Sequence, residues 1–299
     1  MKLNLKFKMH INVIGDIHGR KSWKALVSDE CVNVFVGDYF DPYEKISHEQ
    51  LRENFLDIVA YKQTHPETIL LIGNHDKHYI SGMEESTRYD HHFAAEAQQL
   101  LTENADLMQA AVAFGDTLIT HAGVSAIWYL LNAVFPEIRK LINANNEKFK
   151  DFKSVDEIAK FVQKRNKDVD FQTIFILWRN RFWYFANGKW QNPQVTPDEL
   201  AAWINQQWKT NPAIFDFCPY SDEMSGDSPL QGPMWIRPNS LLSSNIFSGT
   251  KFRQIVGHTQ FEEILDTAKM ESMKDLAPIV FVDCLASKAE AYKFESESL

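Results

Sequence analysis

Five short polar segments of this chain combine glycine with Asp, Asn or His. They are Gly-Asp-Ile-His-Gly at 15–19, Gly-Asp-Tyr-Phe-Asp at 37–41, Gly-Asn-His-Asp at 73–76, Thr-His-Ala-Gly at 120–123 and Gly-His-Thr at 257–259. Glycine lets the backbone turn sharply and approach a ligand closely, while carboxylate, amide and imidazole groups bind divalent metals. Because four of the segments directly follow a strand-like apolar run, together they predict a dinuclear metal site at strand ends.

The elements that must position these segments follow an alternating pattern. The expected elements of the first part are strands at 11–14, 32–36 and 69–72 and helices from about 21 and over about 47–64. The order β-α-β-α-β predicts parallel pairing, and ligands of parallel sheets gather beyond the carboxyl ends of the strands. Ser47 and Gln50 form the pattern of a capping box at the start of the second helix.

Further along, a helix is expected near 93–101 and a hairpin over 110–120, around Gly115-Asp116. Apolar runs at 254–256, 278–282 and 289–294 are interpreted as a second sheet. At the other end, residues 2–13 alternate apolar and polar side chains, which predicts a strand with one solvent-facing side.

Ligands that begin near residue 16 and end near 258 must converge, so the chain is expected to form a single domain over 1–299. Residues from about 125 to 232 carry no catalytic segment and are rich in aromatic side chains. Helix-period stretches at 127–143, 155–164 and 197–208 predict a helical insertion there. Its return, 221–233, concentrates Ser, Gly, Asp and Pro, and we expect a long surface loop near the site.

The five segments together resemble the signature of the calcineurin-like metallophosphoesterases. The segments at 15–19 and 37–41 most resemble the phosphoprotein-phosphatase branch and its bacterial and phage relatives. The resemblance implies an α/β fold, an α-β-β-α sandwich of two mixed sheets flanked by helices, with the helical insertion inside it. It also implies a phosphomonoester hydrolase of the phosphoserine/threonine protein phosphatase type, in which a metal-bridging hydroxide attacks phosphorus.

The resemblance further implies two divalent metal ions and their ligands. These are Asp16 and His18 on the first metal, Asp38 as the bridge, and Asn74, His121 and His258 on the second. A set of carboxylate, imidazole and amide ligands suits manganese, the expected metal, or iron or zinc.

By the same resemblance, Asp41 is hydrogen-bonded to His75, which protonates the leaving group. A neighbouring carboxylate favours the charged imidazole and fixes its orientation, as a general acid requires. Two alternatives stay open: Asp41 caps the turn before Pro42, or His75 is a further metal ligand. The amide of Asn74 can serve metal or substrate without adding charge.

Two departures from the family bear on substrate. The segment at 257–259 lacks the second histidine of many metallophosphoesterases, and Pro42 stands where the phosphoprotein phosphatases usually have a phosphate-binding arginine. The candidate replacements are Arg237, Arg179 with its neighbour Arg181, and Arg20, each with structural salt bridging as the alternative.

The substrate therefore remains open between a phosphoprotein and a nucleotide. Hydrolysis of a dinucleoside polyphosphate or another nucleotide is the alternative activity. Outside the enzymes, the alternative is a catalytically silent partner-binding module of the same fold. The sequence does not fix the oligomeric state.

Composition excludes other partners. The formal net charge of -9, without a run of Lys and Arg, argues against coating nucleic acid. The three lysines at the start interrupt any signal-peptide core, and no apolar run approaches the roughly 18 residues of a membrane span. No membrane association is expected, and a cytoplasmic location is the default expectation.

Overall fold

The computed structural model describes residues 8–134, 184–186, 189–191, 195–217, 227–245, 252–273 and 276–297. Its core is two five-stranded mixed sheets. The first has the order β12 (Ala291–Glu297), β1 (Lys8–Ile14), β2 (Val32–Phe35), β3 (Ile69–Leu71) and β4 (Met108–Gln109). Strands β1 to β4 are parallel, as the β-α-β-α-β pattern predicts, and β12 is antiparallel to β1.

The second sheet has the order β10 (Leu265–Asp266), β11 (Ile279–Phe281), β9 (Arg253–Val256), β6 (Thr117–Thr120) and β5 (Ala111–Phe114). Strands β11, β9 and β6 are parallel, while β10 and β5 are antiparallel edges. The hairpin β5–β6 turns at Gly115, whose φ of 60° is the left-handed conformation that glycine adopts readily. A separate small hairpin joins β7 (Tyr184–Ala186) and β8 (Lys189–Gln191).

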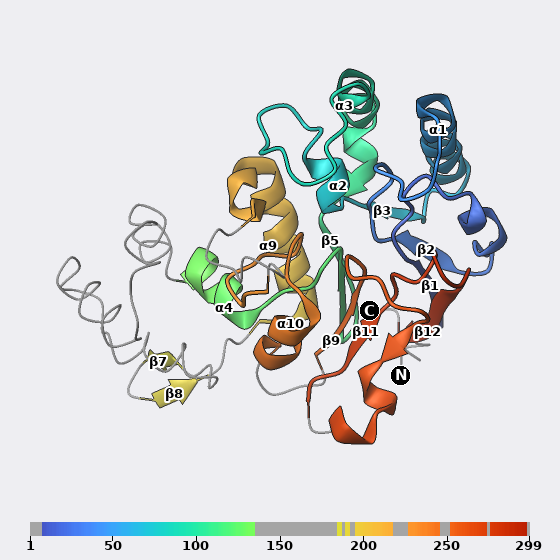
Figure 1. The fold of residues 1–299 in the computed structure, drawn as a ribbon. Coiled ribbons are helices and arrows are strands. Elements are labelled where there is room, and N and C mark those ends of the chain that lie inside the picture. Colours follow the sequence, from blue (N-terminus) through green and yellow to red (C-terminus); the bar gives the residue numbers. More distant parts are fainter. Residues whose placement is uncertain are drawn as a thin grey trace, which may run out of the picture.

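Helices cover the outer faces of the two sheets (Figure 1). The α-helices of the described residues are α1 (His48–Thr64), α2 (Asn74–Lys77), α3 (Ala94–Glu103), α4 (Ala126–Tyr129), α9 (Pro197–Thr210) and α10 (Pro238–Ser244). Single turns of 3-10 helix occur at Ser22–Ala25, Ala105–Leu107, Pro212–Phe215, Thr267–Lys269 and Glu271–Met273, and a π-helical turn at Leu130–Val134. Helix α1 starts with the expected capping box, because Ser47 and Gln50 bond to each other's backbone N–H at 3.2 and 2.9 Å. None of the described helices is long and apolar enough to cross a membrane.

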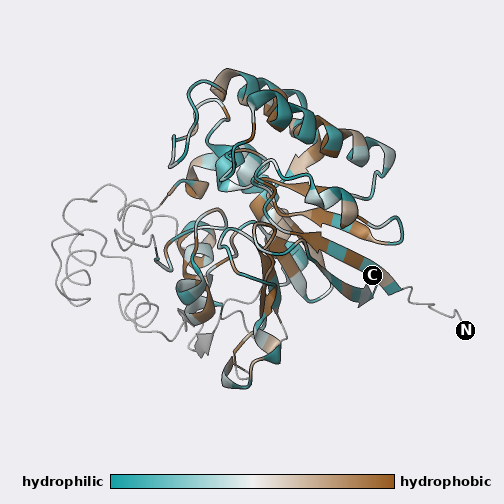
Figure 2. Cartoon of the chain, turned by 45° about the vertical axis from the view of Figure 1, so that its right-hand side comes forward, coloured by the Kyte–Doolittle hydropathy of each residue, from teal (hydrophilic) through white to brown (hydrophobic). Residues whose placement is uncertain are grey.

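Apolar side chains from both sheets meet in the layer between them. This cluster contains Ile11, Val13, Val34, Val36, Leu71, Ile119, Ile255, Val280 and Val282. A second cluster buries the opposite face of the first sheet under α1 and α3 and continues under α9, which packs on β5 and β6 of the second sheet; a third packs α10 on the second sheet. Hydrophobic colour accordingly concentrates on the central strands and polar colour on the outward helices and loops (Figure 2). The layers are those of an α-β-β-α sandwich, and they fix the strand ends relative to one another.

Three expectations about the elements are wrong. The expected helix from about 21 is only one 3-10 turn, because the chain already turns at Ser28 to enter β2 at Val32. Asn12 does not face solvent: it is fully buried and donates to Leu26 O and Asn33 Oδ1, both at 2.8 Å. Strands of a sheet covered on both faces need no polar side.

The last strand belongs to the first sheet rather than the second. β12 pairs along the whole of β1, which would otherwise expose an unpaired edge.

The interval from 125 to 232 is described only in part. The expected helix at 197–208 is present as α9, whose Asn205 side chain bonds to the backbone of Ala110 and Ala111 and so ties the helix to the second sheet. The expected helix at 155–164 lies outside the described residues. The described end of the expected surface loop, 227–233, is instead mostly buried.

Candidate active site

The ligand candidates lie at the carboxyl ends of five parallel strands drawn from both sheets. Asp16 follows β1, Asp38 follows β2, Asn74 follows β3, His121 follows β6 and His258 follows β9. Within each sheet these strands are parallel, so their carboxyl ends lie at one edge of that sheet. Ligand atoms of Asp16, Asp38 and His121 consequently lie within 4.8 Å of one another, and all three residues are buried.

Asp38 is the centre of this group. Its Oδ2 lies 3.5 Å from Nε2 of both His18 and His121, and its Oδ1 accepts the backbone N–H of His75 at 2.9 Å. One carboxylate therefore faces imidazoles from two separate segments. A bridging ligand between two metals requires such a placement.

Asn74 joins the remaining histidine to the group. Its Oδ1 lies 2.8 Å from Nε2 of His121 and 2.9 Å from Nδ1 of His258. The amide oxygen and the two imidazole nitrogens thus converge on one point. All six residues that sequence places in the metal site are brought together.

Backbone carbonyls orient two of the imidazoles. Nδ1 of His18 lies 2.9 Å from Phe40 O and 3.0 Å from Asp41 O, and Nδ1 of His121 lies 2.9 Å from Val36 O. A carbonyl can only accept, so Nδ1 carries the proton in each ring. The lone pair is then on Nε2, the atom that faces Asp38, as a metal ligand requires.

Two glycines allow the carboxylates to approach the backbone this closely. A Cβ at Gly257 would lie 2.0 Å from Asp16 Oδ1, and one at Gly73 would lie 2.1 Å from Asp38 Oδ1. Any larger residue would displace the carboxylate. The glycines of the polar segments are therefore needed for space around the ligands.

The backbone of the site is held in an uncommon conformation. Among the described residues, the non-glycine positions with positive φ are His18, Asp38, Asp41, His258 and Arg88. Such conformations cost on the order of 1 kcal/mol or more and cluster at functional sites. Apart from Arg88, these residues are ones that sequence assigns to the site.

Burial sets the charge of the site. It lowers the pKa of His18 to about 4 and also lowers the pKa values of His121 and His258, so the three imidazoles are neutral near pH 7. Burial, together with the nearby charges of Asp283 and Asp38, raises the pKa of Asp16 well above its usual value. The result is a set of neutral imidazoles around buried carboxyl groups.

These residues fit a bound divalent metal. Asp16 Oδ1 is buried and has no hydrogen-bond partner among the residues that the structure describes, and its neighbour is a second buried carboxyl group, Asp283. Unpaired buried polar atoms are costly, and a cation would satisfy this one. The oxygen and nitrogen donors are those that manganese, iron and zinc share.

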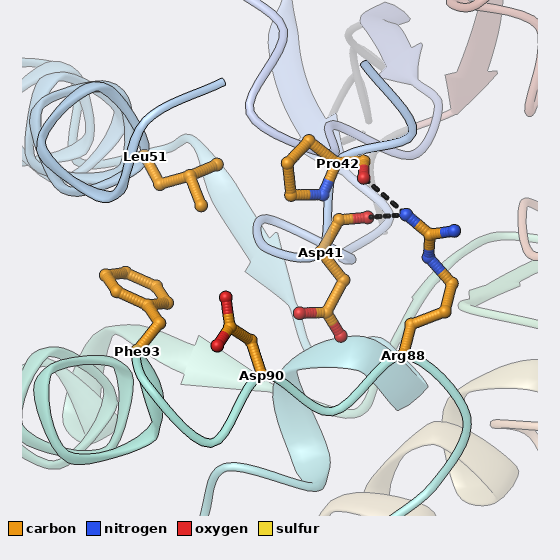
Figure 3. Close-up of a pocket in the computed structure, with 6 residues that line it drawn as sticks. All are labelled: Asp41, Pro42, Leu51, Arg88, Asp90 and Phe93. Atoms are coloured by element: carbon orange, nitrogen blue, oxygen red, sulfur yellow. Dashed lines mark hydrogen bonds between the residues drawn. The ribbon is translucent and has the colours of Figure 1, made fainter. Parts of the chain in front are cut away.

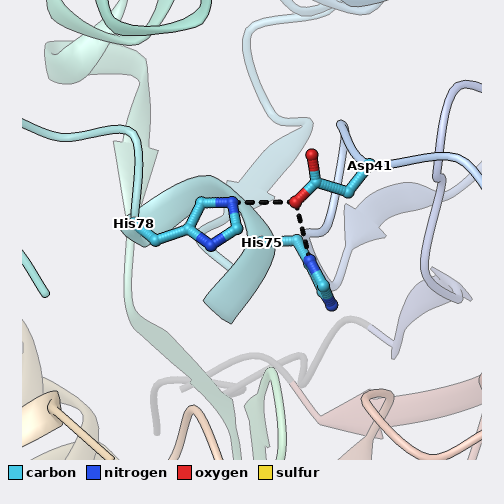
Figure 4. A group of neighbouring side chains, drawn as sticks. All are labelled: Asp41, His75 and His78. Atoms are coloured by element: carbon cyan, nitrogen blue, oxygen red, sulfur yellow. Dashed lines mark hydrogen bonds and ion pairs between the residues drawn. The ribbon is translucent and has the colours of Figure 1, made fainter. Parts of the chain in front are cut away.

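Beside the metal group, Asp41 contacts His75 and His78 (Figure 4) and also Tyr79. His75 Nδ1 lies 2.8 Å from Asp41 Oδ2, the expected hydrogen bond, and His78 Nε2 lies 2.8 Å from the same oxygen. The approach of His78 is off the direction of a hydrogen bond, so it is a close polar contact rather than a donated bond. The Tyr79 hydroxyl donates to Asp41 Oδ1.

The pKa shifts of Asp41 and His75 have the opposite sign to those of Asp16 and His18 in the metal group. Burial raises the pKa of Asp41, but hydrogen bonds from His75 and Tyr79, together with the close contact of His78, outweigh it and leave the pKa lowered. Burial lowers the pKa of His75, but Asp38 and the hydrogen-bonded Asp41 raise it by more, to above 6.5. Asp41, His75 and His78 are close enough to hold a metal.

Asp76 ties the two halves of the site together. Its carboxylate accepts backbone N–H groups from Asp38, Tyr39 and Gly73 at 2.7, 2.7 and 2.9 Å. It is fully buried and supports the ligand segments rather than the ligands themselves.

The candidate arginines differ in their pairing. Arg237 Nη1 donates to His258 O at 3.4 Å and Thr259 Oγ1 at 3.2 Å, which places its guanidinium beside the metal group. Arg20 is paired with Glu44 at 2.9 Å, so the alternative of a structural salt bridge holds for it. Arg179 and Arg181 lie outside the described residues.

Sequence reasoning missed Asp283 and Tyr79 and assigned His78 no catalytic role. Asp283 follows β11, so the rule that located the other ligands at strand ends could have found it. His78 and Tyr79 had no such signal, because their role depends on the short helix α2 turning them toward Asp41.

Two mixed sheets with a buried carboxylate, imidazole and amide cluster at their strand ends define a metal-dependent hydrolase. The family model of calcineurin-like phosphoesterases matches residues 9–207, about two thirds of the chain. The chain therefore belongs to the calcineurin-like phosphoesterase family, and it is a metallophosphatase.

No curated protein matches the sequence. Among solved structures, a cold-active protein tyrosine phosphatase is similar, with a TM-score of 0.44 and 16% identity over 95% of this chain and 73% of that one. A cold-active protein-tyrosine phosphatase of a psychrophilic Shewanella species gives a TM-score of 0.41 and 17% identity over 95% and 75% of the two chains. Likeness at this level does not bear on substrate.

Proposed function

We propose that this chain is a dinuclear metal-dependent phosphomonoesterase of the phosphoserine/threonine protein phosphatase type, from the bacterial and phage branch of the family. One observation carries the proposal: the buried group of Asp16, Asp38 and His121 lies directly beside the Asp41–His75 pair. A cation site next to a charged imidazole is what hydrolysis of a phosphate ester requires.

We assign the two metals as follows. Asp16 and His18 would hold the first, Asp38 would bridge, and Asn74, His121 and His258 would hold the second, with Mn²⁺ as the proposed ion. When bound, the metals would supply positive charge toward phosphate oxygens and lower the pKa of water. The neutral imidazoles favour this role, because a protonated histidine cannot bind a metal.

His75 is the proposed general acid. Asp41 accepts a hydrogen bond from Nδ1–H of His75. The other ring nitrogen, Nε2, is then left to carry the proton that passes to the departing alcohol oxygen. The carboxylates of Asp38 and Asp41 raise the pKa of this ring, which favours its protonated form. His78 and Tyr79 hold the Asp41 carboxylate, and with it the orientation of the acid.

Arg237 and Asn74 are the proposed substrate contacts. No carboxylate of the described residues pairs with Arg237 within the 4.0 Å of an ion pair, so its charge is available to a phosphate group. The amide of Asn74 adds a neutral donor and acceptor close to the same place.

The alternative substrate is a dinucleoside polyphosphate or another nucleotide, which the absence of an arginine directly after Asp41 favours. Purified, manganese-loaded protein should be assayed side by side on phosphopeptides, nucleoside phosphates, dinucleoside tetraphosphate and a phosphodiester. The proposal predicts the highest kcat/KM on phosphoserine or phosphothreonine peptides. Preference for the dinucleotide would select the alternative, and no turnover together with no retained metal would select a silent binding module.

A further inference from the structure

An exposed arginine that sequence reasoning did not select lies at the edge of the metal group. Arg88 Nη2 donates to the backbone carbonyls of Asp41, at 3.4 Å, and Pro42 (Figure 3). His18 Nδ1 lies 3.0 Å from that same Asp41 carbonyl. A single carbonyl oxygen thus separates the guanidinium from a ligand of the metal group.

Tyr43 holds the plane of this guanidinium. The Cζ atom of Arg88 lies 4.1 Å from the centroid of the Tyr43 ring, the geometry of a cation–π contact. The same ring meets His18 edge-on at 4.9 Å between centroids, and 58% of Tyr43 is exposed. Arg88 is therefore fixed on one face by an aromatic ring and along one edge by two carbonyls, at the mouth of the site.

The charge of Arg88 has no carboxylate partner among the described residues, whereas Arg20 pairs with Glu44 and Arg52 with Glu49 and Glu96. A guanidinium has five N–H donors. Contacts to two carbonyls through Nη2 leave the donors on Nε and Nη1 for a ligand.

Open space lies beside this side chain. A cavity of about 330 Å³ opens next to Arg88 and is lined also by Asp41, Pro42, Leu51, Asp90 and Phe93 (Figure 3). Fork-shaped donors of this kind match the oxygens of a phosphate group in pairs.

We propose that Arg88 binds the non-bridging oxygens of the substrate phosphate from the His18 side, with Tyr43 as the residue that positions its guanidinium. Arg237 contacts the backbone at His258, so the two arginines would hold the phosphate from different sides of the metal group. The inference rests on the proposed phosphoesterase function and adds a substrate-binding residue to it.

The test is the binding of inorganic phosphate to the full manganese-loaded chain, measured by calorimetry. Arg88→Ala should weaken phosphate binding about tenfold or more, the loss expected for a charge-assisted bidentate contact, and Arg88→Lys should restore part of it. Arg52→Ala, which removes an exposed arginine on α1, is the matched control and should leave the affinity unchanged. Bound manganese, counted in each variant, should stay equal to that of the wild type.

Tyr43 provides a second variant pair. Tyr43→Ala should weaken phosphate binding about threefold, as expected for loss of a stacked cation, and Tyr43→Phe should lose less because the ring remains.

Equal phosphate affinity in wild type and Arg88→Ala overturns the inference, as does a wild type that binds no phosphate at all. Turnover of an aryl phosphate by the wild type is measured separately. Its presence with unchanged affinity in Arg88→Ala would reject the role of Arg88 and leave the proposed function standing.

Discussion

Two buried groups of histidine and aspartate lie side by side in this molecule, and they differ in how their charges are paired. In the metal group, Asp16 Oδ1 has no hydrogen-bond partner in the described part of the chain, and the imidazoles of His18 and His121 have lowered pKa values. In the network around Asp41, each carboxylate oxygen faces at least one donor, and the pKa of His75 is raised.

The difference shows that residue type alone does not decide function at a buried site. The same two side chains suit a cation site where carboxyl groups crowd together, and suit the proposed proton donor where one carboxylate meets several donors. Substitutions that alter one group and spare the other can break or sharpen this comparison.

The largest effect is expected from Asp38→Asn. This change removes the charge that faces both His18 and His121, so metal affinity should fall and kcat/KM should drop at least about a thousandfold. Metal content and turnover of an aryl phosphate measure it. Circular dichroism checks the fold, and full metal retention with normal turnover would contradict the assignment.

His75→Asn should leave metal content unchanged and lower kcat about a hundredfold on an alkyl phosphate. A p-nitrophenolate leaving group needs little protonation, so the loss on p-nitrophenyl phosphate should be much smaller. The ratio of the two losses is the measurement. Equal losses on both substrates would show that His75 is not the acid.

Asp283→Asn should change stability in the metal-free protein. Burial and the charge of Asp38 raise the pKa of Asp283 from 3.8 to about 7. The folded state therefore holds this proton more tightly than the unfolded state, and stability is lost as pH rises from about 4 to 7. Asp283→Asn has no such proton and does not lose this stability. The unfolding free energy of the variant minus that of the wild type should therefore be roughly 2 to 4 kcal/mol larger at pH 8 than at pH 4.5.

Urea unfolding with chelator present measures this difference, and Asp106→Asn, at an exposed position, is the control. A difference that does not depend on pH would contradict the raised pKa of Asp283.

The smallest effect is expected from Tyr79→Phe. It removes one charge-assisted hydrogen bond to Asp41, so kcat should fall about three- to tenfold with unchanged metal content. Tyr39→Phe is the matched control, because its buried hydroxyl bonds to Leu71 O at 3.0 Å and does not touch Asp41. A larger loss in the control would show that the effect comes from packing.

Strand positions and ligand candidates could be predicted because each depends on local sequence. An apolar run followed by Gly and Asp marks a strand end whether or not its partners are known. The pairing of β12 with β1 and the burial of Asn12 could not be predicted in this way, since both depend on what covers a strand from distant parts of the chain.

The same limit applies within the site. The Asp41–His75 contact was expected from a resemblance, whereas the second histidine on Asp41 and the position of Arg88 beside Pro42 depend on the path of the chain after α2. Contacts made by loops could not be predicted, because the sequence of a loop does not specify the path of its backbone.

Metal stoichiometry in two variants tests the central claim most directly. Chelator-treated protein is titrated with Mn²⁺, and bound metal is counted in the wild type, Asp16→Asn and Asp41→Asn. The account predicts two ions in the wild type, two in Asp41→Asn and fewer in Asp16→Asn. Loss of metal from Asp41→Asn with full retention in Asp16→Asn would place the cation site in the other group and contradict the account.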